Sequence, residues 1–99
     1  MRRETHNHLI PAMLIHPGEI LKDELDARGM TQKELAEKTK RPQQTISLII
    51  TGRKGISEET AVDLEQAFNG ELSAEFWLSL DANYRLHSER RKRQERKAG

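Results

Sequence analysis

Hydrophobic residues recur along this chain at intervals of three and four, the spacing that places side chains on one face of an α-helix. Stretches that contain glycine, proline or a capping serine or threonine separate the apolar segments. The pattern predicts five helices, which begin near Pro17, Gln32, Pro42, Glu58 and Ala74. The fold class that we expect is therefore all-α.

The central stretch, residues 31–52, has the pattern of two short helices joined by a tight turn. Thr31, followed by Glu34 three positions later, is a capping-box pattern that starts the first of these helices. Proline restricts the residue before it and fits only the first turn of a helix, so Arg41 and Pro42 separate the two helices. Lys40 lies in the turn.

The second of these helices has one apolar and one largely polar face. Its apolar stripe consists of Ile46, Ile49 and Ile50, whereas Gln44, Ser47, Leu48 and Thr51 lie opposite and Gln43 lies at the exposed tip. Glutamine can pair with adenine through two hydrogen bonds, which discriminates between bases by roughly 1 to 3 kcal/mol. We therefore interpret this segment as a recognition helix for the major groove of DNA, with base contacts from Gln43, Gln44 and Ser47.

Leu48 is an unusual residue for a base-reading face. It either contacts a thymine methyl group, which would favour a thymine-containing site, or is simply tolerated there. After the helix comes the basic loop Gly52-Arg53-Lys54-Gly55. Surface turns often carry such residues for solubility, but the position of this loop favours contacts of Arg53 and Lys54 with phosphates.

The composition limits the size of the core. Of 99 residues, 34% are hydrophobic and 33% are charged. This suffices for one domain whose core is either unusually thin or shared with a second subunit. A homodimer is therefore one expectation from composition alone.

The formal net charge of +1 conceals an uneven distribution. Residues 85–99 carry seven basic and two acidic side chains, and residues 1–84 carry ten basic and fourteen acidic ones. Within residues 31–54, two acidic residues accompany six basic ones, namely Lys33, Lys38, Lys40, Arg41, Arg53 and Lys54. The helical pair is thus a basic island, as phosphate binding requires.

Several classes of function find no support. The absence of cysteine excludes disulfides, thiolate metal sites and cysteine nucleophiles. His6 and His8 could hold a metal, but no third ligand of matched spacing follows, and we expect neither a metal nor a cofactor. No nucleophile-and-base constellation, paired-carboxylate site or glycine-rich phosphate loop is apparent, so we expect no enzyme. The first eighteen residues lack the apolar run of a signal peptide or membrane span, which indicates a cytoplasmic protein.

The helical pair resembles the Cro/Xre family of helix-turn-helix proteins. The likeness rests on Gln32 and Ala36, and on the segment from Gln43 to Gly52 with Ile46 and Ile49. It implies a five-helix, lambda-repressor-like domain that binds double-stranded DNA. It also implies that Gln32 contacts a phosphate and that Arg53 and Lys54 flank the groove, and we add Thr45 to these phosphate contacts. Lys40 and Thr51 depart from the family pattern, which usually has glycine and asparagine there. The resemblance therefore implies a left-handed backbone at Lys40, which would cost a non-glycine residue about 1 kcal/mol.

A narrower resemblance, to HigA-type antitoxins, spans roughly residues 14–86. It rests on His16-Pro17-Gly18-Glu19-Ile20-Leu21, on Gly55-Ile56-Ser57 with Thr60-Ala61, and on Phe76-Trp77-Leu78 with Asn83-Tyr84. The resemblance implies a homodimer that represses its own operon at a palindromic operator and neutralises a RelE-like ribonuclease toxin. A transcriptional regulator without a toxin is the alternative, and a protein-binding module that has lost DNA binding is a third.

These arguments divide the chain into an N-terminal arm (1–13), a helix-turn-helix domain (14–86) and a basic C-terminal tail (87–99). The tail is either the solvated end of a helix or a disordered basic arm. Trp77 and Tyr84 are candidates for a dimer interface, because aromatic residues are favoured interface anchors. The apolar segment from Leu9 to Ile15 is a second candidate for that interface.

Overall fold

The computed structural model describes the backbone of residues 15–98, within which five helices form. They are α2 (Pro17–Arg28), α3 (Gln32–Thr39), α4 (Gln43–Ile50), α5 (Glu58–Ala67) and α6 (Ala74–Ala98). The predicted all-α, five-helix fold is therefore confirmed. The predicted N-terminal arm, with His6 and His8, lies outside the described residues.

Three of the helices begin at the hydroxyl residues that the sequence predicted as caps. Thr31 accepts a hydrogen bond from the backbone N–H of Glu34, and Ser57 accepts one from that of Thr60. Ser73 accepts one from the backbone N–H of Phe76 at 3.0 Å. Each side chain satisfies an N–H group that the first turn of its helix leaves without a partner.

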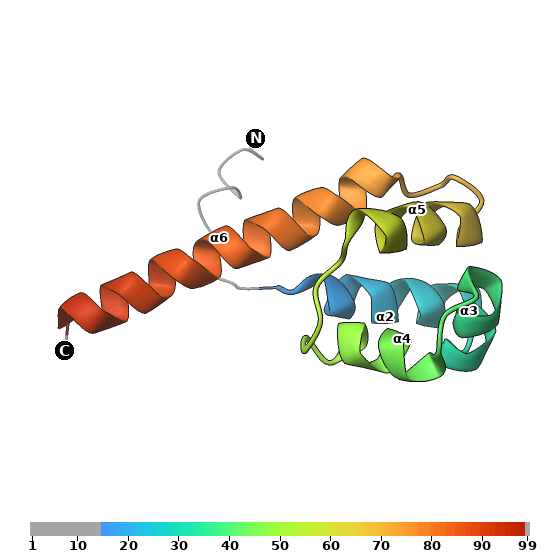
Figure 1. Cartoon of the computed structure of the whole chain (residues 1–99), viewed down its shortest axis with the longest axis horizontal. Helices are drawn as coiled ribbons and strands as arrows, with labels where there is room; N and C mark the ends of the chain where they lie inside the picture. The colour runs from blue at the N-terminus through green and yellow to red at the C-terminus, as the bar shows by residue number, and fades with distance from the viewer. Residues whose placement is uncertain (1–14, 99) are drawn as a thin grey trace.

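The short helices pack around α2, and α6 lies across one side of them. In Figure 1, α2 lies between α4 below and α5 and α6 above, and α3 closes the right-hand end. Helices α3 and α4 pack against each other, α2 packs on both α4 and α6, and α5 packs on α3 and α6. Every helix thus presents one face to a common core.

The core joins the apolar stripes of all five helices. Its buried residues are Leu21, Leu25, Leu35, Ala36, Ile46, Ile49, Ile56, Ala61, Leu64, Ala67, Phe68 and Trp77. Trp77 is 0% exposed and its ring centroid lies 5.3 Å from that of Phe76 and 6.1 Å from that of Phe68. Because Trp77 has no surface left to bury against a second subunit, its prediction as an interface residue is wrong. The cluster of Phe68, Phe76 and Trp77 instead packs α6 against the C-terminal end of α5.

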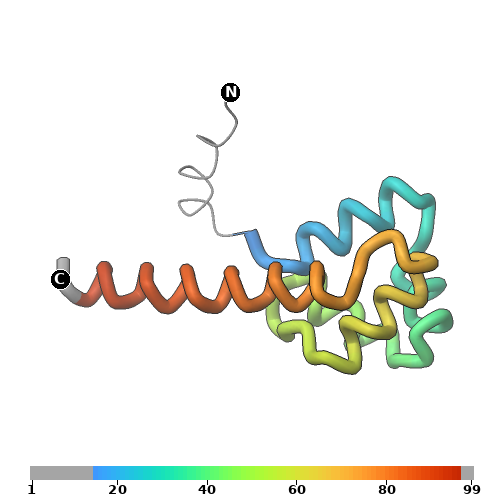
Figure 2. Tube along the Cα trace, turned by 90° about the horizontal axis from the view of Figure 1, so that it is seen from above, coloured from blue at the N-terminus to red at the C-terminus, as the bar shows by residue number. Residues whose placement is uncertain are grey.

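Helix α6 extends well beyond the core. Figure 2 shows its C-terminal half projecting from the body formed by the other helices. The predicted boundary at residue 87 falls inside this helix, and the charge run is its solvated end. There Arg93 donates a hydrogen bond to Glu89 at 3.0 Å, one turn away, an arrangement that supports an exposed helix. Within residues 15–98, none of the helices could span a lipid bilayer.

Candidate nucleic-acid interface

The capping box at the start of α3 closes as predicted. The side chain of Thr31 accepts from the N–H of Glu34 at 3.0 Å, and Glu34 Oε1 accepts from the N–H of Thr31 at 2.8 Å. The hydrogen bond from the Thr31 backbone, followed by that from its side chain, lowers the pKa of Glu34 below its ordinary value. Gln32, the first residue of α3, is partly buried beside this cap. The cap therefore fixes the backbone that carries the predicted phosphate contact.

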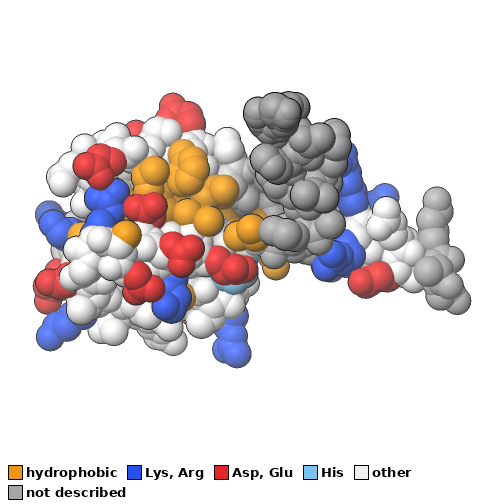
Figure 3. All heavy atoms as spheres, turned by 180° about the vertical axis from the view of Figure 1, so that it is seen from behind, with side chains coloured by type: hydrophobic (Ala, Val, Ile, Leu, Met, Phe, Trp, Pro, Cys, Tyr) orange, Lys and Arg blue, Asp and Glu red, His pale blue; other side chains and the backbone are white. Residues whose placement is uncertain are grey.

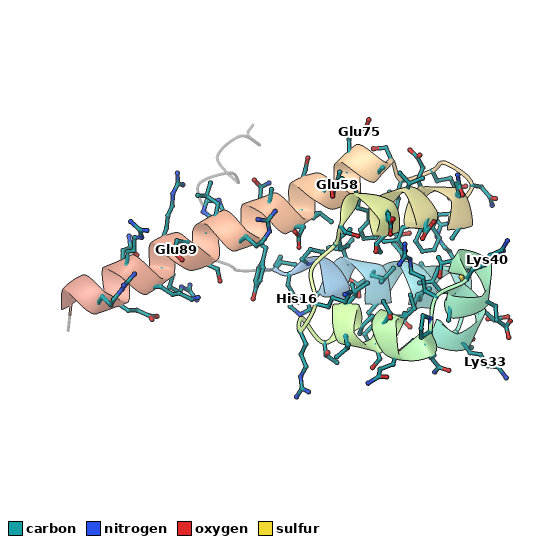
Figure 4. The ribbon with its side chains drawn as sticks, viewed as in Figure 1. His16, Lys33, Lys40, Glu58, Glu75 and Glu89 are labelled. Carbon is teal, nitrogen blue, oxygen red and sulfur yellow. The ribbon has the colours of Figure 1, made fainter. Side chains whose placement is uncertain are left out.

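The turn between α3 and α4 has the left-handed residue that the sequence suggested. Lys40 adopts φ 57°, and Arg41 donates its backbone N–H to the carbonyl of Ala36 at 3.0 Å. The side chain of Lys40 points outward from the end of α3, as does that of Lys33 near its start (Figure 4). Two basic residues of the helical pair thus face solvent.

Arg41 does not belong to the exposed basic island. Its Nε donates to Asp63 of α5 at 2.6 Å, and its Nη2 lies 3.6 Å from Glu59. Both carboxylates are negatively charged and attract the Arg41 guanidinium toward α5. Arg41 therefore ties the turn to the scaffold, and it should not be counted among phosphate contacts.

Helix α4 exposes the face that was predicted to read bases. Ile46 and Ile49 are buried, while Gln43 and Gln44 are exposed at its N-terminal end. The remaining candidates on this helix, namely Thr45, Ser47 and Leu48, are partly buried. The helix follows Pro42, and no side chain caps it. The exposed amides and the uncapped first turn are thus both available to an external partner.

The hydroxyl of Thr51 turns back onto α4. It donates to the carbonyl of Ser47 at 3.0 Å, with that of Leu48 at 3.2 Å. The carbonyl of Leu48 also accepts the backbone N–H groups of Arg53 and Lys54, at 2.9 and 3.2 Å. Threonine therefore closes the C-terminal end of α4 locally, and the next residues fold back into a tight basic loop.

The basic loop rests on the N-terminal end of α2. Gly52 adopts φ 80°, and a Cβ there would lie 3.1 Å from His16 Nε2. His16 itself caps α2, because its Nδ1 accepts the N–H of Gly18 at 3.1 Å. Figure 4 shows His16 at this end of α2, beside the loop. Arg53 and Lys54 are exposed, so the loop presents its two charges to solvent.

Gly18 explains why glycine follows His16-Pro17. A Cβ at this position would lie 2.0 Å from the carbonyl oxygen of Ile49 and 2.7 Å from the Cα of Ile50. The first turn of α2 therefore touches the backbone at the end of α4 directly. The sequence predicted a helix that begins near Pro17 but did not reveal the role of Gly18 in placing the recognition helix. The only local signals were the neighbouring His16 and Pro17, which mark the start of a helix.

The structure thus brings the predicted DNA-contacting residues of α4 and its loop together on consecutive segments. Gln43 and Gln44 lie at the start of α4, and Arg53 and Lys54 follow its end. Among the described residues, no group of three or more histidine, aspartate or glutamate side chains could hold a metal ion. The chemistry available at this surface is amide hydrogen bonding flanked by positive charge.

Comparisons with known proteins give the context of this surface. Residues 21–74 match the model of a helix-turn-helix family, HTH_3. Virulence-associated protein A′ of Dichelobacter nodosus is 39% identical over 71 residues, which cover 72% of this chain and 61% of that protein. This chain therefore spans less than two thirds of the length of that relative.

Two solved structures are similar over most of their length. An addiction module antidote protein of a HigA family from Coxiella burnetii has a TM-score of 0.76 and is 32% identical, covering 84% of this chain and 89% of that one. The antitoxin HigA of Pseudomonas aeruginosa with the higBA promoter has a TM-score of 0.77 and is 33% identical, covering 85% and 90%.

Proposed function

Because the chain belongs to the helix-turn-helix family and, within it, to the HigA antitoxins, we propose that it binds operator DNA and represses its own operon. The observation that carries the proposal is the exposed amide pair of α4, flanked by the exposed basic loop. Membership of a helix-turn-helix family also supports the expectation that the chain is not an enzyme.

The residues divide into two roles at the DNA. Gln43, Gln44 and Ser47 contact base edges, and Leu48 lies beside them at the position where a thymine methyl group would be met. Phosphate contacts come from Gln32, Thr45, Arg53 and Lys54 and set the register without reading sequence. Loss of a base-reading residue therefore changes which sequence is preferred, whereas loss of a phosphate contact weakens binding to every sequence.

A homodimer is the form that we propose for operator binding. One eight-residue recognition helix makes few base contacts, whereas two-fold pairing places two helices about 34 Å apart on one face of a palindromic operator. Figure 3 shows hydrophobic side chains gathered on the face opposite the view of Figure 1. Helices α2 and α6 contribute partly buried hydrophobic residues that could pair, among them Ile20, Phe76 and Leu80.

Tyr84 remains the proposed aromatic anchor of this dimer. Its ring packs edge-on against His16 at 5.8 Å, and its side chain is only partly buried. Sedimentation equilibrium on the wild type and on Tyr84→Ala tests the assignment. A monomeric variant supports it, and an unchanged dimer moves the interface elsewhere.

The experiment for DNA binding uses the sequence upstream of the gene as its probe. Fluorescence anisotropy across a salt series compares the wild type with the double variant Gln43→Ala plus Gln44→Ala. The matched control is Gln66→Ala plus Gln94→Ala, which removes two exposed glutamines from α5 and α6. We expect the first pair to abolish the preference over unrelated DNA and the control to retain it. If the wild type shows no such preference, the operator-binding proposal is wrong.

The partner that we propose is a small ribonuclease toxin of the RelE-like type. Coexpression with the product of the neighbouring gene and purification through a tag on either protein test this. A stable complex in which ribonuclease activity is suppressed supports the antitoxin role. Specific DNA binding without such a complex would favour the alternative, an Xre-family regulator that has no toxin.

A further inference from the structure

A single buried carboxylate anchors the basic loop to α6. Asp81 is only 5% exposed, and its Oδ1 accepts the backbone N–H of Ile56 at 3.2 Å. Its Oδ2 accepts from Arg85 Nε at 2.9 Å, which balances the charge of the carboxylate. Asp81 therefore joins the segment directly after Arg53 and Lys54 to a helix 25 positions further along the chain.

The loop is shaped to reach this carboxylate. A Cβ on Gly55 would lie 2.9 Å from Asp81 Oδ1, so the missing side chain allows the backbone to approach. At the other end of the loop, Gly52 lies against His16, whose ring packs on Tyr84 of α6. Both ends of the loop thus rest on α6, one directly and the other through His16.

Anchoring matters because the loop is rich in glycine. The Leu48 carbonyl holds the start of the loop, through the backbone N–H groups of Arg53 and Lys54. Without Asp81, the end of the loop at Gly55 would still sample many conformations, and ordering it at the DNA would weaken binding. Asp81 is not itself placed to contact DNA, because its side chain is buried and its negative charge would repel phosphate. Its effect on DNA passes through the backbone that carries the two basic side chains.

We infer that Asp81 is a positioning residue for DNA binding: by accepting the Ile56 N–H, it holds Arg53 and Lys54 where they meet phosphates. The inference rests on the proposed function, because it assigns Asp81 a part in operator affinity. It goes further in making α6 a support of the DNA surface as well as a part of the core.

The test compares Asp81→Ala with Asp81→Asn. Both substitutions remove the negative charge and the ion pair with Arg85, but only asparagine keeps an oxygen that can accept the Ile56 N–H. We expect Asp81→Ala to weaken binding to the upstream duplex roughly tenfold and to reduce the slope of log K against log salt by about 1 to 2. Asp81→Asn should retain most of the wild-type affinity and most of the wild-type salt slope.

Gly55→Ala is a second variant, which disturbs the same contact by a change in the loop and not in α6. Its added methyl group would displace the Asp81 carboxylate without removing any group from α6. It should reproduce the weaker binding and the smaller salt slope, with the ranking of operator base variants unchanged. Circular dichroism sets a temperature at which every variant is folded, so that a loss of stability alone does not alter the slope.

Amide hydrogen exchange of the free proteins completes the test. In Asp81→Ala we expect faster exchange across residues 52–56, with α3 and α4 still protected. Equal DNA affinity and salt slope for Asp81→Ala and Asp81→Asn would overturn the inference, as would unchanged loop exchange. If the wild type shows no preference for its upstream duplex, the proposed function fails and the DNA role of Asp81 with it, while faster exchange would still establish the anchor.

Discussion

Helices α3 and α4 have the same length and pack against each other, yet their N-terminal ends differ. Each contains eight residues. In α3, Thr31 and Glu34 satisfy each other's backbone N–H groups through a complete capping box. In α4, Pro42 stands at the cap position and makes no side-chain hydrogen bond. The sequence of α3 thus closes its own end, whereas α4 keeps its first turn open at the surface proposed to meet DNA.

The difference means that α4 must be positioned by its neighbours. Gly18 of α2 lies against the carbonyl of Ile49 and the Cα of Ile50, at the end of α4. Arg41, just before α4, is held by Asp63 of α5. The N-terminal end of α4, whose polar groups are left for a partner, is therefore positioned by contacts from α2 and α5, whereas the N-terminal end of α3 is closed by its own residues.

The largest effect should come from Gly18→Ala, which attacks this external support. The added Cβ would lie 2.0 Å from the Ile49 carbonyl oxygen, a backbone atom that has no rotamer to change. We expect a loss of about 3 kcal/mol in the free energy of unfolding, measured by urea denaturation. Gly29→Ala is the control, since its Cβ would meet nothing within 4 Å and only its φ of 63° opposes alanine. It should cost about 1 kcal/mol, and an equal cost for the two variants would contradict the role of the contact.

Removing the local cap of α3 should have a smaller effect. Thr31→Ala deletes the acceptor for the Glu34 N–H, and we expect a loss of about 1 kcal/mol in the free energy of unfolding. The ranking of operator variants should not change, because Thr31 lies outside the predicted base contacts. Thr51→Ala is a matched control whose exposed hydroxyl only bonds back to α4 carbonyls. If both variants lose the same stability, the capping box is not what distinguishes α3.

Features set by neighbouring residues in the chain were predictable from sequence. The caps at Thr31, Ser57 and Ser73 and the left-handed turn at Lys40 depend on residues within one helical turn. The apolar stripe of α4 identified its buried residues Ile46 and Ile49, and the helical pair identified the family. The helical end of α6 also had a local signal in the Glu89 and Arg93 pair, four positions apart.

Features set by distant residues were not predictable in this way. Arg41 was counted as a surface charge because its partner, Asp63, lies 22 positions away. Trp77 was a candidate for the dimer interface because aromatic residues are favoured interface anchors, and helical periodicity does not show which faces of α6 the rest of the fold covers. Asp81 gave no signal, since a lone acidic residue in a helix usually faces water. These contacts depend on how α5 and α6 fold back over the helical pair.

A smaller effect, and one that stabilises the protein, is expected from a substitution at Lys40, where the turn between α3 and α4 departs from the family pattern. Lys40 holds φ 57° without the freedom of glycine, so Lys40→Gly should relieve a strain of about 1 kcal/mol. Part of that gain is offset because glycine also gives the unfolded chain more freedom. Thermal unfolding should show a small rise in Tm. Asn69→Gly, at φ 58°, should gain less, because asparagine tolerates this conformation better, and a larger gain at Asn69 would refute the account of Lys40.

The smallest effect should be a pH dependence of the α3 cap. The pKa of Glu34 is lowered, chiefly because its carboxylate accepts the Thr31 backbone N–H. A group whose pKa is lower in the folded state contributes stability that is present above its unfolded pKa and lost as pH falls through the folded value. Urea unfolding of the wild type and Glu34→Gln should therefore differ most above pH 4.5, the ordinary value, and converge at more acidic pH. The glutamine variant keeps an acceptor for the Thr31 N–H, so convergence of the two free energies of unfolding in acid would assign the difference to the charge on Glu34. A difference in free energy that persists unchanged in acid would show that the charge does not strengthen the cap.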